Sequence, residues 1–138
     1  MRWYCPGCWR DFGEDLARCP HCGLDIQGFW SSKDYVEKLI LALRHPEPTT
    51  PVRAAEVLGR LQAGQAVEPL MELVRANSDV FIVRSAIRAL AAIGNSAALQ
   101  FLETLTQSAA EWIRREAAAA LDSAVSKDMT APRNGDPR

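Results

Sequence analysis

The sequence lacks the features that mark a membrane protein or a nucleic-acid-binding protein. No apolar run approaches the roughly 20 residues that a membrane helix needs. The 16 basic and 17 acidic residues give a net charge of −1, so the chain as a whole does not attract phosphate or anionic lipid. No apolar stretch of the kind found in secretion signals follows Arg2. We therefore expect a cytoplasmic protein that neither enters a membrane nor favours nucleic acid.

The sequence is also poor in groups that catalyse reactions. His21 and His45 are its two histidines. His21 lies within a turn, and His45 precedes the helix-breaking Pro46, where it can interact with a helix C-terminus. Neither histidine has a nucleophile or carboxylate partner that the sequence identifies. We therefore predict no catalytic residues and no enzyme.

The sequence has no cysteine after position 22, but it has four within the first 22 residues. Cys5 with Cys8 and Cys19 with Cys22 form two C-x2-C pairs, separated by ten residues. Two short turns, each presenting two thiolates, can converge on one tetrahedral metal ion when the loop between them folds back. Free thiols or two disulfides are the alternative, but the paired spacing without a secretion signal favours metal. We therefore predict that all four cysteines bind one metal ion.

A shell of four thiolates leaves a metal no open position for a substrate. The predicted ion would then stabilise the fold and take no part in catalysis. Because four thiolates already fill the shell, we expect His21 to be a turn residue and not a ligand. The ligand set by itself admits zinc, or iron in a rubredoxin-like electron carrier.

The region from residue 29 to 125 shows helical periodicity and no strand pattern. We expect its first helix over Ser32–Arg44, with Ser31 as its cap and a hydrophobic staple between Trp30 and Tyr35. Further apolar stripes at helical spacing predict helices up to a last one over 110–124. Residues 126–138, which include Pro132, lose this periodicity and are expected to form a disordered tail.

The predicted helices repeat at a fixed interval along the chain. Leu58 recurs as Leu90, and Leu70 recurs as Leu102 at the same interval. A period of about 30 residues, with two short helices per unit, is typical of an α-solenoid, in which neighbouring units stack to bury their apolar faces. The helix Ser32–Arg44 would complete a leading unit and the helix 110–124 would begin a trailing one.

The cysteine region resembles the short zinc-ribbon domains found at the N-termini of many prokaryotic proteins. The resemblance lies in Cys5-x2-Cys8 and in Cys19-Pro-His-Cys22-Gly23, and it implies one structural Zn²⁺ in a ribbon over residues 1–28. Trp9 departs from the pattern, because it stands after the first pair where the family has a small residue. A bulky residue there would strain the turn or shield the metal.

The helical region is similar to HEAT-like repeats of the type found in phycobilisome lyases. The second unit keeps the family's apolar residue, arginine, small residues and closing glycine, at Ile82, Arg84, Ala86, Ala89, Leu90, Ile93 and Gly94. The last unit keeps Ile113, Arg114, Arg115, Ala117, Ala120 and Leu121. The first unit departs from the pattern, with Val57 for the small residue and Gln62 for the glycine. The resemblance implies a mainly α fold, a short solenoid of helix pairs over 29–125.

Two surface features allow a functional and a structural interpretation. Arginines near the starts of the first helices could grip an acidic partner or phosphates, at Arg53, Arg84, Arg114 and Arg115. Pairing with acids such as Glu56 and Glu111 is the interpretation that the balanced charge favours. Aromatic residues of the ribbon could stack on a base or peptide, but we expect several to pack it against the first helix as an N-terminal cap: Trp3, Tyr4, Trp9, Phe12, Phe29 and Trp30.

These features predict a zinc-binding adaptor or scaffold that binds a protein partner through its repeats. The concave face and the C-terminal end are the expected binding surfaces. The alanine run 117–120 offers a docking or self-association surface on helix 110–124. A phycobilin-lyase-like accessory subunit and a nucleic-acid-binding module using the ribbon and the arginines are the alternatives.

Overall fold

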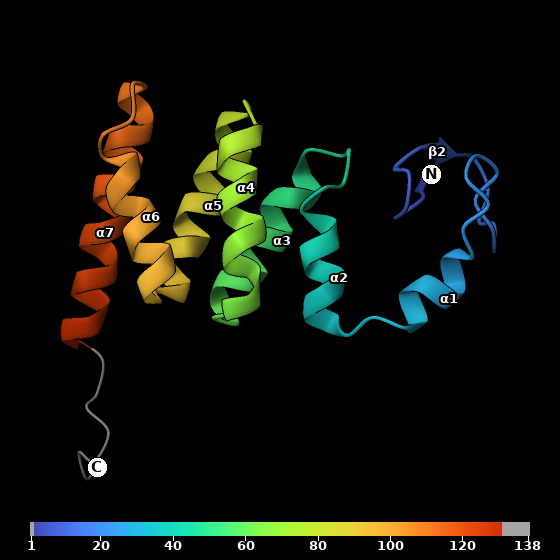
Figure 1. The fold of residues 1–138 in the computed structure, drawn as a ribbon, viewed down its shortest axis with the longest axis horizontal. Coiled ribbons are helices and arrows are strands. Elements are labelled where there is room, and N and C mark those ends of the chain that lie inside the picture. Colours follow the sequence, from blue (N-terminus) through green and yellow to red (C-terminus); the bar gives the residue numbers. More distant parts are fainter. Residues whose placement is uncertain (1, 131–138) are drawn as a thin grey trace, which may run out of the picture.

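A computed structural model describes residues 2–130, with side chains over 2–125. Its described part holds seven α-helices and one two-stranded antiparallel sheet, arranged from one end of an elongated molecule to the other (Figure 1). The strands β1 (Trp3–Tyr4) and β2 (Asp11–Phe12) belong to the N-terminal segment, which we define as residues 2–25. None of the helices in the described residues combines the length and the apolar character of a membrane-spanning helix.

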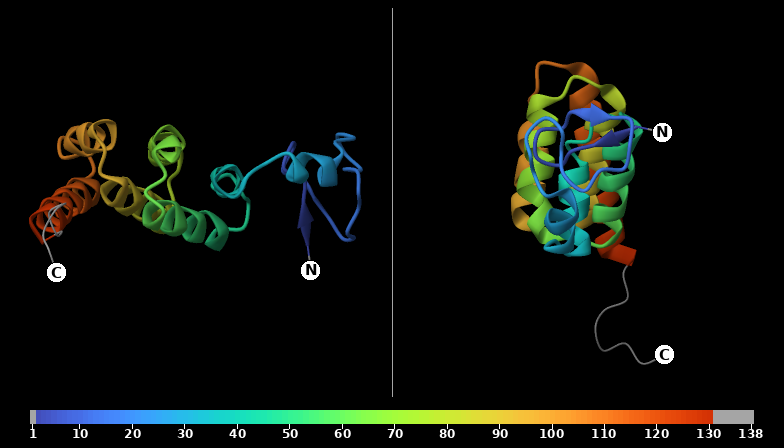
Figure 2. Two further views of the ribbon diagram at one scale, coloured as in Figure 1. Left: turned by 90° about the horizontal axis from the view of Figure 1, so that it is seen from below. Right: turned by 90° about the vertical axis from the view of Figure 1, so that its right-hand side faces the viewer.

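The helices after residue 34 form two layers (Figure 2). The first layer contains α3 (Thr49–Arg60), α5 (Val80–Ile93) and α7 (Glu111–Thr130), which pack side by side in this order. The second layer contains α2 (Tyr35–Ala42), α4 (Val67–Ala76) and α6 (Ser96–Leu105). A short 3-10 helix, Gly64–Ala66, leads into α4. This alternation confirms the predicted solenoid of stacked helix pairs.

One apolar core runs between the two layers. Its repeated positions are equivalent in space as well as in sequence, because Leu58, Leu90, Leu70 and Leu102 are all fully buried. The first-layer helices α3 and α5 approach each other closely at Gly59, where an added Cβ would lie 3.1 Å from the Cα of Ala89. The core therefore depends on both large repeated side chains and a small residue at the helix crossing.

The predicted start of the first helix is wrong. Instead of one helix over Ser32–Arg44, the structure has α1 (Ile26–Ser31) and then α2, which Asp34 caps by accepting a hydrogen bond from the Glu37 N–H at 2.8 Å. Asp25 likewise caps α1 by accepting from the Gly28 N–H at 3.1 Å. Two aspartates thus start two helices, and Ser31 ends the first one.

The predicted hydrophobic staple does not form. Tyr35 is 62% exposed, so it does not fix the entry of the chain into α2. Trp30 instead packs edge-on against Phe29 within α1, with ring centroids 5.5 Å apart.

The last helix extends further than its periodicity predicted. α7 continues to Thr130, past the predicted end at residue 124 and into the region 126–138 predicted as a tail. The stretch 126–130 contains neither glycine nor proline, and the next proline is Pro132, so nothing in this stretch breaks the helix. The remainder of the predicted tail lies outside the described residues.

Candidate metal centre

The four cysteines predicted as ligands come together in the N-terminal segment. All four Sγ atoms lie within 4.8 Å of one another, and no disulfide joins any of them. Cys5 Sγ and Cys22 Sγ are 3.6 Å apart, and Cys8 Sγ and Cys19 Sγ are 3.7 Å apart. A tetrahedron with metal–sulfur bonds of about 2.3 Å separates its sulfurs by about 3.8 Å. The spacing of these sulfurs therefore fits a four-thiolate metal site and is too long for S–S bonds.

Two turns of the same design hold the cysteines. In the first turn, the Cys5 N–H donates to the Arg10 carbonyl at 3.1 Å and the Trp9 N–H donates to the Cys5 carbonyl at 2.8 Å. In the second turn, the Cys19 N–H donates to the carbonyl of Leu24 at 2.9 Å, and the Gly23 N–H donates to the carbonyl of Cys19 at 3.0 Å. The antiparallel pairing of Trp3 with Phe12 closes the first turn. Each C-x2-C pair is thus fixed by backbone hydrogen bonds.

Backbone N–H groups point at the sulfurs and favour their thiolate form. The Gly7 N–H donates to Cys5 Sγ at 3.3 Å. Cys19 Sγ accepts from the N–H groups of His21 at 3.3 Å and Cys22 at 3.4 Å. Desolvation raises the pKa of the Cys19 thiol, but these two donors together with hydrogen bonds from the Cys5 and Cys22 thiols lower the pKa to about 6. At Cys5 desolvation dominates and raises the pKa of the thiol.

The surroundings of the sulfurs form a small, closely packed enclosure. Cys5 and Cys19 are buried, Cys8 is half-buried and Cys22 is exposed. A Cβ added to Gly7 would lie 3.0 Å from the Leu24 side chain and within 4 Å of the sulfurs of Cys5 and Cys22. Glycine therefore keeps the first turn close to the cluster, as a small ligand enclosure needs.

Trp9 adopts the backbone conformation that the zinc-ribbon pattern gives to a small residue. Its φ is +58°, beside +78° for Gly23 at the equivalent place in the second turn. The left-handed conformation costs a residue with a Cβ about 1 kcal/mol or more. The expected strain is therefore present at Trp9. Its side chain compensates by packing edge-on against His45, with ring centroids 5.7 Å apart.

The N-terminal segment contacts the loop after α2. Tyr4 packs edge-on against His45, with ring centroids 4.6 Å apart, and its hydroxyl donates to Glu47 Oε1 at 3.1 Å. The expectation that the ribbon aromatics pack against the first helix is therefore wrong for Tyr4 and Trp9. The loop offers a planar ring at His45, whereas the apolar residues of α2 face the solenoid core.

The two histidines have structural roles. His21 is exposed and donates from Nε2 to the Asp11 carbonyl at 3.2 Å, which ties the second turn to β2. It is outside the cysteine cluster, in agreement with its prediction as a turn residue. His45 Nδ1 accepts from the Glu47 N–H at 3.1 Å. Burial lowers the pKa of His45, partly offset by the Glu47 carboxylate, so the ring is neutral at pH 7.

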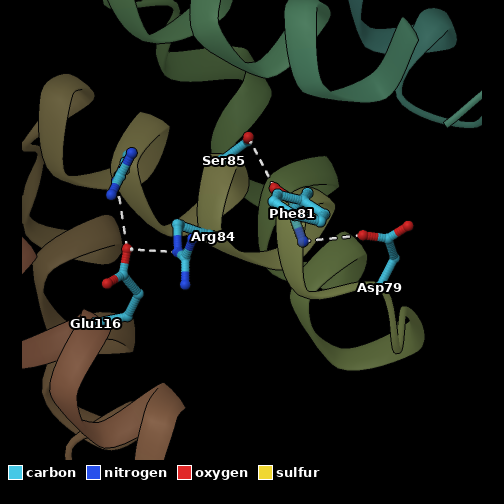
Figure 3. Close-up of polar contacts among 6 residues, drawn as sticks. Asp79, Phe81, Arg84, Ser85 and Glu116 are labelled. Carbon is cyan, nitrogen blue, oxygen red and sulfur yellow. Dashed lines mark hydrogen bonds and ion pairs between the residues drawn. The ribbon is translucent and has the colours of Figure 1, made fainter. Parts of the chain in front are cut away.

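Three of the four arginines near the starts of the first helices make intramolecular contacts. Arg84 Nε and Arg88 Nε lie 3.2 and 3.3 Å from the same Glu116 oxygen, which is on α7 (Figure 3). Arg115 pairs with Glu111 at 2.8 Å, as predicted. Arg114 donates to two carbonyls of the loop before α7, at 2.7 and 3.1 Å. The sequence did not indicate Glu116 as a partner, because it belongs to the next repeat and meets Arg84 only when repeats stack.

Arg53 differs from the other three arginines. It is exposed, and the ion pairs found among residues 2–125 do not include it, so the predicted pairing with Glu56 is not observed.

The alanine run on α7 does not form one continuous surface. Ala117 and Ala120 are buried against α5 and α6, whereas Ala118 and Ala119 are exposed. A helix turn places every third or fourth residue on the same side, so four consecutive alanines cannot share one face. The smooth docking face predicted for 117–120 is therefore wrong.

Comparison of the sequence with known protein families supports the solenoid fold. The sequence pattern of HEAT repeats matches residues 36–122, from the first turn of α2 into α7. No curated protein matches the chain. The match covers well over half of the chain and begins after the cysteine cluster, so it identifies the helical region. The chain belongs to the HEAT-repeat family.

Proposed function

We propose that the protein is a scaffold that binds another protein through its HEAT repeats and holds one structural zinc ion in an N-terminal zinc ribbon. The observation that carries the metal part is the convergence of four thiols, at tetrahedral spacing, from two turns of the same design. A bound zinc ion would neutralise thiolate charge and cross-link the two turns. Cys5, Cys8, Cys19 and Cys22 would hold it.

The position of the cluster supports a role as a terminal cap. In Figure 1 and in the left view of Figure 2, the N-terminal segment lies beyond the α2 end of the solenoid. Tyr4 and Trp9, which flank the first cysteine turn, contact His45 at that end. Ordering the turns by metal would fix these two rings on the loop after α2, where an α-solenoid otherwise ends in an open face.

Several observations support binding over catalysis. Four protein ligands leave a metal ion no position for a substrate. HEAT repeats present extended grooves between stacked helices, and two such grooves occur on opposite layers of this solenoid. The proposal includes a cytoplasmic location, because cysteines stay reduced and able to bind zinc where glutathione prevents disulfides. The phycobilisome-lyase type stays a prediction.

The metal part is tested by zinc analysis of the purified full chain. We expect one zinc per chain, lost on Cys8→Ser with loss of order in the N-terminal segment. His21→Ala is the matched control, because His21 lies in the second turn but outside the cluster, and it retains zinc. An iron-loaded protein with a visible absorption band would contradict the proposal.

The binding part is tested by affinity purification from the native cell. We expect one protein to be retained in stoichiometric amount by the wild-type chain, and reconstitution from the two purified proteins to reproduce the complex. Recovery of a bilin pigment instead would favour the lyase-like alternative. Retention of nucleic acid with a steep dependence on salt would favour the other alternative.

A further inference from the structure

A groove crosses the outer side of the first layer between α3 and α5. Its wider part is a cavity of about 690 Å³, to which α3 and the start of α5 contribute. Its lining includes Val52, Arg53, Glu56, Arg60 and Phe81. A second cavity of about 260 Å³ shares Glu56 and Arg60 with the first. The two cavities therefore form one groove along the pair of helices, which we call the α3–α5 groove.

The wider part of the groove has an apolar anchor point. Phe81 is 70% exposed at the first turn of α5, and its neighbour Val80 is 39% exposed. Val52 and Val57 of α3 are half-buried in the same cavity. An exposed aromatic ring beside half-buried aliphatic side chains is the kind of surface at which protein interfaces concentrate binding energy. The fold does not need the Phe81 ring, because it lies outside the core.

The groove carries a small excess of positive charge. Arg53 and Arg60 are exposed and are in none of the ion pairs found among residues 2–125. Arg88 lines the narrower part and shares the Glu116 oxygen with Arg84, while 69% of its side chain stays exposed.

The acids of the groove only partly balance this charge. Glu56 is exposed between Arg53 and Arg60. Asp79 is engaged as the cap of α5, where its Oδ1 accepts from the N–H of Phe81 at 2.9 Å (Figure 3). The same oxygen accepts from the N–H of Ile82 at 3.4 Å. Among the described residues, the groove thus holds three guanidinium groups against two carboxylates, and Asp79 is held in place as a helix cap.

The groove on the opposite layer has the reverse charge. Between α2 and α4 a cavity of about 520 Å³ is lined by Glu68 and Glu72, with Arg44 as its one basic residue. The two grooves would therefore select different partners, since like charges across an interface cost binding energy.

We propose that the α3–α5 groove binds an acidic protein segment that carries an aromatic or aliphatic anchor. The anchor packs on Phe81, Val52 and Val57, and carboxylates of the segment accept hydrogen bonds from Arg53 and Arg60. This inference rests on the proposed function as a protein-binding scaffold and assigns it a surface and a partner chemistry.

The test is an NMR titration of the ¹⁵N-labelled full chain with synthetic peptides of about 14 residues. The first peptide carries tryptophan and leucine on one helical face and glutamate elsewhere. The second has lysine for each glutamate, and the third has alanine for the two apolar residues. We expect the first peptide to shift amide signals of α3 and the start of α5, and the other two to bind at least about tenfold more weakly.

Variants locate the binding. We expect the double variant Arg53→Glu, Arg60→Glu and the single variant Phe81→Ala each to weaken the first peptide by about tenfold or more. Both sites are exposed, and circular dichroism checks that the variants stay folded. Arg44→Glu, in the groove between α2 and α4, is the matched control and should change the affinity by less than about twofold.

Several results would overturn the inference. They are shifts confined to α2 and α4, equal binding of the lysine peptide, or no shifts up to about 1 mM of the first peptide. Concentration-dependent shifts of the same signals without peptide would place a second copy of the chain in the groove instead.

The inference and the proposed function can fail separately. If a native partner binds the double variant Arg53→Glu, Arg60→Glu as tightly as the wild type, the groove is not its site and the scaffold function stands. If no protein partner is found but the first peptide binds as described, the groove stands and the scaffold function lacks support.

Discussion

Gln62 donates a hydrogen bond from its side-chain Nε2 to the carbonyl of Ala92, 3.2 Å away in the next repeat. Gln62 holds the place that Gly94 holds one repeat later, and both adopt left-handed backbone, with φ of +51° and +66°. Ala92 lies in the last turn of α5, where carbonyls have no partner within the helix. The residue that departs from the repeat pattern therefore keeps the glycine conformation and caps a neighbouring helix.

Substitutions at Gln62 separate these two effects. Gln62→Ala keeps the left-handed strain and removes the hydrogen bond, so we expect it to lower the free energy of unfolding by about 1 kcal/mol. Gln62→Gly removes both and should stay within about 0.5 kcal/mol of the wild type, because relief of strain offsets the lost bond. Urea denaturation measures both. Equal stability of the alanine and glycine variants would show that the backbone at this position carries no strain.

Gly59 should not tolerate a methyl group. An alanine there would place its Cβ 3.1 Å from the Ala89 Cα and 3.3 Å from the Ala92 Cβ, so α3 and α5 must separate. We expect Gly59→Ala to lower the free energy of unfolding by about 1–3 kcal/mol. Gly64→Ala is the matched control, since its Cβ would meet only the Asn95 amide at 3.9 Å. A Gly59→Ala protein as stable as the control would refute the close contact.

Glu116 should matter more than other surface acids. Its carboxylate pairs with both Arg84 and Arg88 across the α5–α7 contact and is only 20% exposed. We expect Glu116→Gln to lower the free energy of unfolding by about 1 kcal/mol. Glu111→Gln, which breaks an exposed pair with Arg115 on the same helix, should cost less than about 0.5 kcal/mol. Identical effects of the two variants in thermal denaturation would contradict the bridging role.

His45 should make stability fall as the pH drops below about 6.5. Because burial lowers its pKa in the folded state, the unfolded chain takes up the proton first as the pH falls, and folding is then disfavoured. Above that pH the His45 ring is neutral in both the folded and the unfolded chain, so it no longer makes stability depend on pH. Protonation of Nδ1 would also remove the acceptor that the Glu47 N–H uses.

The measurement is the melting temperature of the wild type and of His45→Gln between about pH 7.5 and pH 5. Both proteins contain the cysteine cluster, so we take the difference between their melting temperatures as the contribution of the histidine. We expect this difference to change in favour of the variant as the pH falls. A difference that stays constant over this range would show that the pKa of His45 is not lowered by folding.

The cysteine spacing and the repeat period were sufficient to predict the four-cysteine cluster and the solenoid class. Both are local or periodic properties. A C-x2-C turn brings two thiols together by itself, and leucines repeated at one fixed interval lie on equivalent helix faces whatever the exact helix bounds. Asp25 and Asp34 are residues that commonly cap helices, but Ser31 is another such residue, and choosing it as the cap gave the wrong start for the first helix.

What the sequence by itself determined is which residues could bind metal and which faces must be buried. Only the tertiary structure decided the partners that lie far apart along the chain, namely Tyr4 and Trp9 on His45, Gln62 on Ala92, and Arg84 on Glu116. These contacts depend on how one repeat or segment lies against the next. Helix periodicity specifies that apolar faces meet, but the distances between particular polar side chains are set only when the helices pack.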